Sequence, residues 1–342
     1  MDLGIDLGSS RVVICRQGKG VVLDEPSVIA MTPDYKRVIA CGEEAEDMLG
    51  RTPPSIVAAR PVRNGVIAEY EMAERMLRFF LQKVCSNRIA KPCVAVGIPE
   101  NVTEVEKRSF IEALISAGAR RVTLVPTPIA AALGAGLDVS RPCGQMVVDI
   151  GAGVVNAAVL TLKGAAVAQS LRLAGDALDE EIVRYMRAFY GLVISDRVAA
   201  DVKMTVGSAS PITETLTMQA KGRDALTGLP RVQTVTSDEI LEVLAEPVAA
   251  ITGLVQNVLE LTPPELAGDV INEGICLTGG MARMRGMAEQ ITRVTGVPCH
   301  AAENAPHCVA VGAVKALSIS SSFSRVYDLG DYSYRLSDAV TN

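Results

Sequence analysis

The chain has 342 residues, of which 49% are hydrophobic and 21% charged, a balance typical of a well-packed protein large enough for two domains and unlike that of a disordered or fibrous chain. The formal net charge of -6 and the lack of a long basic run argue against a nucleic-acid partner, because such a surface repels a phosphate backbone. The chain shows neither a secretory signal pattern nor an apolar run long enough to cross a bilayer. We therefore expect a cytoplasmic protein whose membrane contact is at most peripheral.

Short runs rich in Val and Ile alternate with amphipathic stretches along the chain, which predicts an α/β fold with largely parallel strands covered by helices. Strands are expected at residues 3–7, 12–16, 93–98, 121–125, 145–150, 156–162 and 274–277. Helices are expected at residues 72–83, 103–118, 179–190, 237–261 and 284–295. The second helix has the clearest start signal, because Thr103 precedes Glu106 by three residues in a capping-box pattern, and Gly118 marks its end.

One pattern occurs twice. The segments 3–9 and 146–153 are each an apolar run that ends in an Asp and continues into a turn of small residues. A further strand follows each of them. This repetition about halfway along the chain predicts two similar half-molecules that face each other across a cleft.

The two turns have the chemistry of a nucleotide site. Small residues let backbone N–H groups approach a phosphate, and an Asp at a strand end can hold Mg²⁺ through its water shell. Asp6 and Asp149 are therefore expected to share one metal ion, with the phosphates cradled by Gly8, Ser9, Ser10, Gly151, Ala152 and Gly153. A single such turn also occurs in ordinary hairpins, so the prediction depends on the pair. A third turn, from Thr278 through Gly279 and Gly280 to Met281, is suited to backbone contact with a nucleotide.

Other site classes find less support. The chain has no GxxxxGK[ST] loop and no full GxGxxG fingerprint, which argues against a P-loop NTPase or a Rossmann dehydrogenase. The eight cysteines form no CxxC pair and are expected to be reduced. Zinc binding by Cys299, His300, His307 and Cys308 is conceivable, but their spacing fits no common zinc template, and packing beside a surface loop is the favoured interpretation.

The turns that follow Asp6 and Asp149 resemble the two phosphate motifs of the actin, Hsp70 and sugar-kinase superfamily, and the turn from Thr278 to Met281 resembles its adenosine motif. The likeness is closer to the MreB/Mbl family of rod-shape-determining proteins, in segments that include residues 18–28, 61–67, 103–108, 129–136 and 173–176. It runs over about residues 1–317. The resemblance implies an actin-like bilobal fold of duplicated ribonuclease H-like domains with a nucleotide cleft between the lobes. It places the first lobe at 1–137 with a small subdomain inserted at about 33–90, the second lobe at 138–317 with one at about 178–250, and a flexible tail at 318–342.

The resemblance also implies a function. The chain would bind ATP with Mg²⁺ and polymerise into filaments at the inner face of the cell membrane that organise cell-wall synthesis and cell shape. Its partners would be further copies of itself, the wall-synthesis machinery, and the bilayer through the loop near Ile89. The carried-over contacts to the nucleoside are Asp201, Lys203, Gly279, Gly280, Met281 and Ala282. The rivals are a small-molecule kinase of the superfamily and an actin-like ATPase that does not polymerise.

Five residues, at four places in the chain, depart from the family pattern. Thr127 replaces the Glu thought to orient the attacking water, which makes the chain at most a slow ATPase with Thr127 and Asp149 as its catalytic positions. Val154 and Val155 replace two threonines after the second phosphate turn, and Thr205 replaces an acid expected at the ribose. Arg11 replaces an Asn and adds a positive charge that either lies near the phosphates or points into solvent. Both weakened hydrolysis and a working ATPase with neutral drift remain open.

Overall fold

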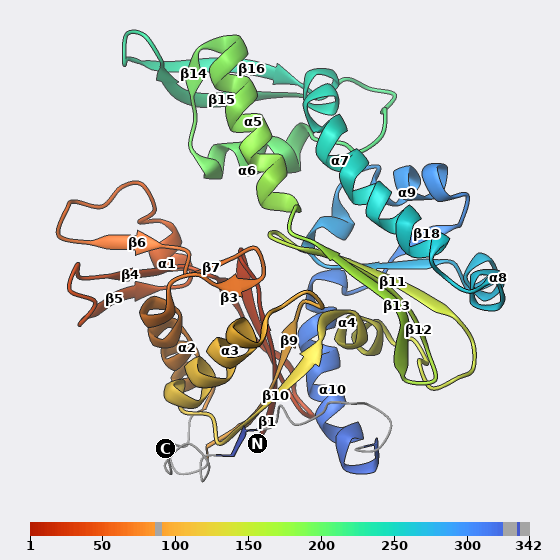
Figure 1. Ribbon diagram of the computed structural model, residues 1–342. Helices are drawn as coiled ribbons and strands as arrows, with labels where there is room; N and C mark the ends of the chain where they lie inside the picture. The colour runs from red at the N-terminus through yellow and green to blue at the C-terminus, as the bar shows by residue number, and fades with distance from the viewer. Residues whose placement is uncertain (86–90, 324–333, 336–342) are drawn as a thin grey trace.

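The computed structural model describes residues 1–85, 91–323 and 334–335. Its first large sheet has the strand order β19-β10-β9-β1-β2-β3. The bounds are β1 Asp2–Leu7, β2 Arg11–Arg16, β3 Gly20–Pro26, β9 Cys93–Ile98, β10 Arg121–Pro126 and β19 Tyr334–Arg335. Strand β1 pairs with β2 in the antiparallel sense and with β9 in the parallel sense. The start of strand β1 lies at the base of the molecule in Figure 1, where the N-terminus is marked.

The second large sheet repeats this arrangement in the order β13-β12-β11-β17-β18. The bounds are β11 Gln145–Ile150, β12 Val155–Thr161, β13 Gly164–Leu171, β17 Ile275–Thr278 and β18 Cys299–Ala301. Strand β11, like β1, has an antiparallel hairpin partner on one side and a parallel neighbour on the other. The prediction of two similar half-molecules is confirmed at the level of strand pairing, and all seven strands that the sequence predicted are present within two residues of their expected bounds.

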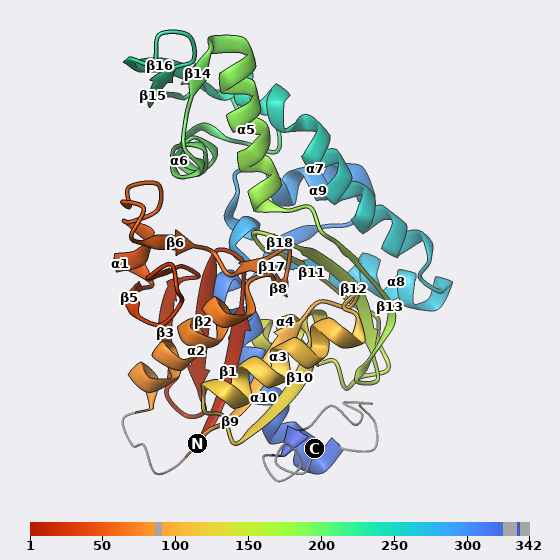
Figure 2. The same ribbon diagram turned by 60° about the vertical axis from the view of Figure 1, so that its left-hand side comes forward.

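Two smaller sheets lie beyond the large ones. One consists of β4 Ile29–Met31, β5 Val38–Cys41 and β6 Val57–Ala59 beside α1 Glu43–Glu46. The other consists of β14 Leu192–Val193, β15 Thr217–Asp224 and β16 Pro230–Thr236 beside α5 Gly175–Tyr190 and α6 Asp196–Val206. A tight hairpin, β7 Val62–Arg63 and β8 Val66–Ile67, reaches from the first of these regions toward the second large sheet (Figures 1 and 2).

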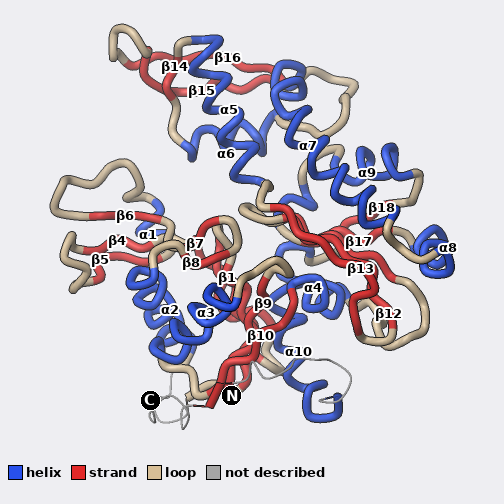
Figure 3. Tube along the Cα trace, viewed as in Figure 1, coloured by secondary structure: helices blue, strands red, loops and turns tan. Residues whose placement is uncertain are grey.

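Helices cover the sheets. On the first sheet lie α2 Tyr70–Val84 and α3 Glu104–Ala117, and beside the second sheet lie α7 Ser237–Glu260, α8 Pro264–Glu273 and α9 Met287–Thr295 (Figure 3). The predicted capping box is present, since Thr103 Oγ1 accepts from the backbone N–H of Glu106 and the Glu106 carboxylate accepts from that of Thr103. Helix α9 begins three residues later than predicted because a 3₁₀ turn, Gly280–Arg283, precedes it.

Helices α4 Thr127–Ala135 and α10 Cys308–Phe323 pack against each other between the two large sheets. Two glycines allow the approach. A Cβ at Gly134 would lie 1.8 Å from the carbonyl oxygen of Cys308, and a Cβ at Gly312 would lie 1.7 Å from that of Ala130. Helix α10 also contacts β1, β2 and β9. Helix α10 thus packs on the first sheet, and its Val309, Ala313 and Ala316 also share a hydrophobic cluster with residues of the second sheet. The lobe bounds of 1–137 and 138–317 stay a prediction.

The C-terminal boundary also needs a correction. We expected a flexible tail from residue 318, but α10 continues to Phe323. Tyr334 and Arg335 then pair with Val122 and Arg121 as an antiparallel edge strand. The remaining tail residues lie outside the described part of the chain.

Replacing Gly312 with alanine is expected to destabilise the protein by roughly 1–3 kcal/mol or more, because the added methyl group overlaps backbone atoms that can move only if the two helices separate. Gly253 is the matched control, since it lies inside α7 and a Cβ added there would have no atom within 4 Å. There, alanine should stabilise by about 0.5–1 kcal/mol. Urea denaturation of both variants tests this, and equal effects at the two sites would contradict the packing argument.

Candidate functional site

Asp149 occupies the end of β11 with a side chain only 6% exposed. Its Oδ1 accepts a hydrogen bond of 2.8 Å from the Thr278 hydroxyl, at the end of the neighbouring strand β17. Burial raises the pKa of Asp149, hydrogen bonds from Thr278 and Asn156 lower it, and the net result is a pKa of about 6. The sequence analysis did not single out Asn156 or the Thr278 hydroxyl as partners of this acid.

Asp6 occupies the corresponding end of β1. Burial of its carboxyl group, followed by repulsion from Asp149 and Asp24, raises its pKa to about 7. The repulsion that Asp6 receives from Asp149 is the interaction expected between acids that lie near each other. Burial raises the pKa of both acids, and neither of them forms an ion pair in the described part of the chain. A divalent cation with its water shell would supply the positive charge. The donor set therefore fits Mg²⁺.

The two glycine turns have the same backbone closure. The N–H of Gly8 donates to the carbonyl of Arg11 over 3.1 Å, and the N–H of Gly151 donates to that of Val154 over 3.0 Å. The turns also meet, because a Cβ at Gly153 would lie 2.4 Å from Ser9 Oγ. The structure thus brings the predicted phosphate residues of both halves together.

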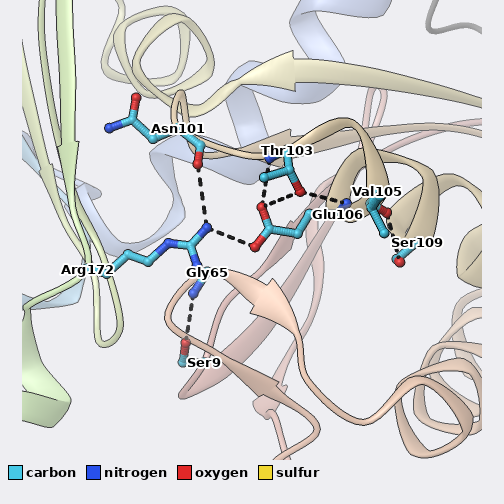
Figure 4. Close-up of polar contacts among 8 residues, drawn as sticks. All are labelled: Ser9, Gly65, Asn101, Thr103, Val105, Glu106, Ser109 and Arg172. Atoms are coloured by element: carbon cyan, nitrogen blue, oxygen red, sulfur yellow. Dashed lines mark hydrogen bonds and ion pairs between the residues drawn. The ribbon is translucent and has the colours of Figure 1, made fainter.

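A third loop, which the sequence analysis missed, lies against both turns. The N–H of Gly65 donates to Ser9 Oγ over 3.4 Å (Figure 4), and the backbone N of Asn64 would lie 2.8 Å from a Cβ at Gly153. Asn64 and Gly65 have positive φ, 50° and 73°, as a two-residue hairpin turn of the Asn-Gly kind requires. The Asn-Gly pair between two short apolar runs was the sequence signal that could have located it.

The Gly279 turn lies beside the second phosphate turn. A Cβ at Gly279 would be 2.3 Å from the carbonyl oxygen of Ile150, and φ there is 84°, so the chain can pass this close only as glycine. Helix α5 begins at the same place, since Gly175 N–H donates to the Gly151 carbonyl over 3.3 Å and Asp176 N–H to the Ala152 carbonyl over 2.7 Å. Gly280 starts the 3₁₀ turn that contains the buried Met281 and Ala282.

Lys203 is 7% exposed on α6. Its ammonium group donates to the Gly175 carbonyl over 2.7 Å and to Asp179 Oδ2 over 2.8 Å. It also lines a cavity of about 280 Å³, together with Met204, Gly207, Arg283, Met284 and Arg285. Asp201 and Thr205 are on the same helix with exposed side chains and do not line this cavity. Of the two predicted α6 contacts, Lys203 lines this cavity and Asp201 does not.

Thr127 is the first residue of α4, with a side chain 7% exposed. Strand registers place it near the acids, because Ile5 pairs with Val96 and Gly97 pairs with Val125, two residues before Thr127. Its hydroxyl would lie 3.6 Å from a Cβ at Gly97, the residue next to the Val96 partner of the acid-bearing strand. Thr127 is therefore at the same edge of the sheet as Asp6.

One of the two alternatives expected for Arg11 was a position near the phosphate turns, and the structure does not place it there. Its guanidinium group pairs with the Asp24 carboxylate and donates to the Asp24 carbonyl over 2.9 Å. The other oxygen of Asp24 lies 3.0 Å from His307 Nε2. Partial burial raises the pKa of Asp24, but the hydrogen bonds from Arg11 and His307 lower it below its usual value. Among residues 1–85, 91–323 and 334–335, no group of three or more His, Cys, Asp or Glu side chains is placed to hold a metal ion.

Polar contacts join the two lobes at the edge of the site. Arg172, which follows β13, donates to Glu106 Oε1 over 2.9 Å, and Glu106 in turn caps α3 (Figure 4). Asn101 Nδ2 donates to the Ser170 carbonyl over 3.2 Å. Between the two smaller sheet regions, Arg197 of α6 pairs with Asp47 over 2.8 Å. These contacts link segments of the first lobe to segments of the second.

Two expectations concern the membrane. The predicted contact at Ile89 lies outside the described residues. Within the residues that are described, none of the helices combines the length and the apolar character needed to span a bilayer.

Comparison with known proteins agrees with this geometry. The profile of the MreB/Mbl protein family matches residues 1–325. The chain is 44% identical over 312 residues to the cell shape-determining protein Mbl of Bacillus cereus, covering 91% of this chain and 94% of that protein. It is also 44% identical over 324 residues to the cell shape-determining protein MreB of Escherichia coli strain K12, covering 93% of each.

Solved structures show the same fold. The crystal structure of MreB5 of Spiroplasma citri bound to ADP has a TM-score of 0.88 and 33% identity, and covers 94% of this chain and 98% of that one. A MamK double helical filament, with a TM-score of 0.76 and 20% identity over 92% of this chain and 98% of that one, shares the fold alone. The predicted actin-like bilobal fold is confirmed, and the chain belongs to the MreB/Mbl family of actin-like cell shape-determining proteins.

Proposed function

We propose that this chain is a cytoskeletal protein that binds ATP with Mg²⁺ between the Asp6 and Asp149 turns and polymerises into filaments. The observation that carries the nucleotide site is the convergence of two acids, whose pKa values are raised to about 7 and about 6, with two backbone turns that meet at Ser9 and Gly153. The related MreB5 has been crystallised with ADP and with AMPPNP. A bound Mg²⁺ would supply the positive charge that the two acids lack.

Different residues of this proposed site would then have different roles. The Gly8–Ser10 and Gly151–Gly153 backbones would donate to phosphate oxygens, while Lys203 and the Gly279 turn would border the nucleoside. Bound nucleotide would favour the closed arrangement that the Arg172–Glu106 and Arg197–Asp47 pairs stabilise. Closure would change the surfaces at the lobe ends, so that nucleotide biases polymerisation by a population shift.

Hydrolysis is proposed to be slow. Thr127 lies where a group that orients or activates water would be needed, and a hydroxyl cannot act as a base near neutral pH. The remaining acids and backbone donors provide electrostatic stabilisation without such a group. Filaments of this chain would therefore retain their ATP for longer than filaments of an ATPase that has a general base at this position.

The cellular role follows from the family. We propose that the filaments lie at the cytoplasmic face of the cell membrane, contact it through the loop near Ile89, and organise cell-wall synthesis. Each subunit would contribute little membrane affinity, so that binding depends on the many copies in a filament.

Sedimentation tests the proposal. We expect purified protein to pellet several-fold more with ATP and Mg²⁺ than with EDTA, and the pelleted fraction to depend on protein concentration above a threshold. Parallel measurement of vesicle co-sedimentation tests the membrane contact. Protein that binds ATP but stays in the supernatant at every concentration would favour a non-polymerising ATPase or a kinase instead.

A further inference from the structure

Arg11, Asp24 and His307 form a polar cluster that joins two strands of the first sheet to the segment before α10. Arg11 donates to the Asp24 carbonyl over 2.9 Å and pairs with its Oδ1, while Oδ2 lies 3.0 Å from His307 Nε2. The side chains are 46%, 33% and 29% exposed, in that order, so water screens these contacts only in part. The nucleotide contacts proposed above use none of these three side chains.

The direction of the hydrogen bond between Asp24 and His307 follows from the charge of Asp24. Partial burial raises the pKa of this acid, but the bonds from Arg11 and His307 outweigh that effect and hold it below its usual value. An ionised carboxylate can only accept hydrogen bonds, so His307 Nε2 carries the hydrogen and donates it. Asp24 is therefore an acceptor held between two donors that come from different segments of the chain.

One end of this cluster is joined to the first phosphate turn. Arg11 directly follows Ser10, and its carbonyl accepts from the N–H of Gly8 over 3.1 Å. Strand β3, which carries Asp24, is tied to the same turn, because the N–H of Ser27 donates to the Ser10 carbonyl over 2.8 Å. A shift of Asp24 would therefore move the turn that is proposed to hold phosphates.

The other end is joined to the Gly279 turn. His307 is the last residue of the 3₁₀ turn Ala305–His307. The carbonyl of Ala305 accepts from the N–H of Gly279 over 2.8 Å, and this short turn also lies against the 3₁₀ turn Gly280–Arg283. The cluster thus connects the turn proposed for the phosphates with the turn proposed for the nucleoside by a path of bonded residues behind the site.

We propose that Arg11, Asp24 and His307 are positioning residues, which hold the Gly8–Ser10 turn and the Gly279 turn at the separation that one nucleotide spans. This inference rests on the proposed nucleotide-binding function, and it gives a role to Arg11, which replaces the Asn of the family pattern. A site whose two sides are already in place binds its ligand more tightly, because less ordering is left to be done on binding. Breaking one link of the cluster should therefore weaken ATP binding, although these side chains would not contact the ATP.

The test compares Mg²⁺–ATP binding to full-length variants by titration calorimetry, which gives the number of sites and the Kd separately. His307→Gln retains an amide donor at about the place of Nε2, whereas His307→Asn is one methylene shorter and equally neutral, and its amide falls short of Asp24. We expect His307→Asn to raise Kd about fivefold, within the range by which residues of a bonded network modulate a distant site, with one site per chain retained. His307→Gln should stay within about twofold of the wild type. His300→Asn, which changes the exposed histidine on β18, is the control and should leave Kd unchanged.

A second variant tests the other link. Arg11→Lys keeps the positive charge but loses the fork that bonds both the carboxylate and the carbonyl of Asp24, so it should also raise Kd. In the double variant with His307→Asn the two effects should not multiply, because either change alone already frees Asp24. Asp24 itself stays unchanged in every variant, since it also repels Asp6 and its removal would alter the proposed magnesium site directly.

The possible results separate the two proposals. If the wild type does not bind Mg²⁺–ATP, the proposed function itself fails. If the wild type binds and His307→Asn has the same Kd as His307→Gln, the cluster does not position the turns, although the nucleotide site stands. A reduced number of sites at unchanged Kd would mean that His307 only supports folding, and multiplied effects in the double variant would mean that Arg11 and His307 act separately. Each of these last two results would also overturn the inference.

Discussion

Replacing Asp149 with asparagine is expected to stabilise the nucleotide-free protein at pH 8 by about 3 kcal/mol, while abolishing its stabilisation by ATP and Mg²⁺. The folded-state pKa of about 6 is higher than the ordinary aspartate value of 3.8. The stability that a protonated Asp149 contributes is therefore present below about pH 4 and is lost as the pH rises through 6. Asparagine stays neutral at every pH, so the gain should appear only above that range. Urea unfolding at pH 8 and pH 4, with EDTA present, measures it.

Asp224 provides a control of opposite sign. Hydrogen bonds from the backbone of Thr227 and Leu226 lower its pKa to about 2, so its charge stabilises the fold above about pH 4 and this contribution is lost on acidification. Asp224→Asn should therefore weaken the protein at pH 8 and leave its response to ATP unchanged. An Asp149→Asn protein that is destabilised equally at both pH values, or that still responds to ATP and Mg²⁺, would contradict the assignment of Asp149.

Introducing a carboxylate at position 127 is expected to raise the rate of phosphate release on the order of 100-fold, the usual contribution of a general base. Thr127 begins α4 at the sheet edge that also carries Asp6, so a longer acidic side chain there can reach a water molecule beside the phosphates. Thr127→Glu and the wild type are compared by phosphate release under conditions where both are saturated with ATP.

Thr127→Gln separates charge from size. Glutamine has the same length as glutamate and can hydrogen-bond water, but it cannot accept a proton at neutral pH. Its rate should stay within a few-fold of the wild type. If Thr127→Glu hydrolyses ATP no faster than Thr127→Gln, the account of a missing base at this position is wrong.

The sequence was sufficient for the sheets because they follow from local patterns. The two strand–Asp–turn segments each specify their own hairpin. That Asp6 and Asp149 share one metal ion stays a prediction from their repetition. The capping box at Thr103 and Glu106 is likewise a local signal, since both partners lie within one helical turn. The exact subdomain boundaries remain a prediction.

Other features depend on contacts between distant segments. The packing of α10 on the first sheet depends on the close approach of its Ala310 and Val314 to Gly4 of β1, which no local pattern contains. Arg11 pairs with Asp24 because neighbouring strands place them on one face, and His307 joins from a segment 283 residues away.

Calorimetric titration with preformed Mg²⁺–ATP tests the central claim most directly. The account predicts one site per chain and, at about pH 6.5, release of protons on binding, because the acids with pKa values of about 7 and about 6 must ionise to face the metal. Repeating the titration in buffers of different ionisation heat measures the released protons, and Asp149→Asn should lose both binding and release. Binding that proceeds unchanged in EDTA, or without any proton release, would contradict a shared magnesium site between Asp6 and Asp149.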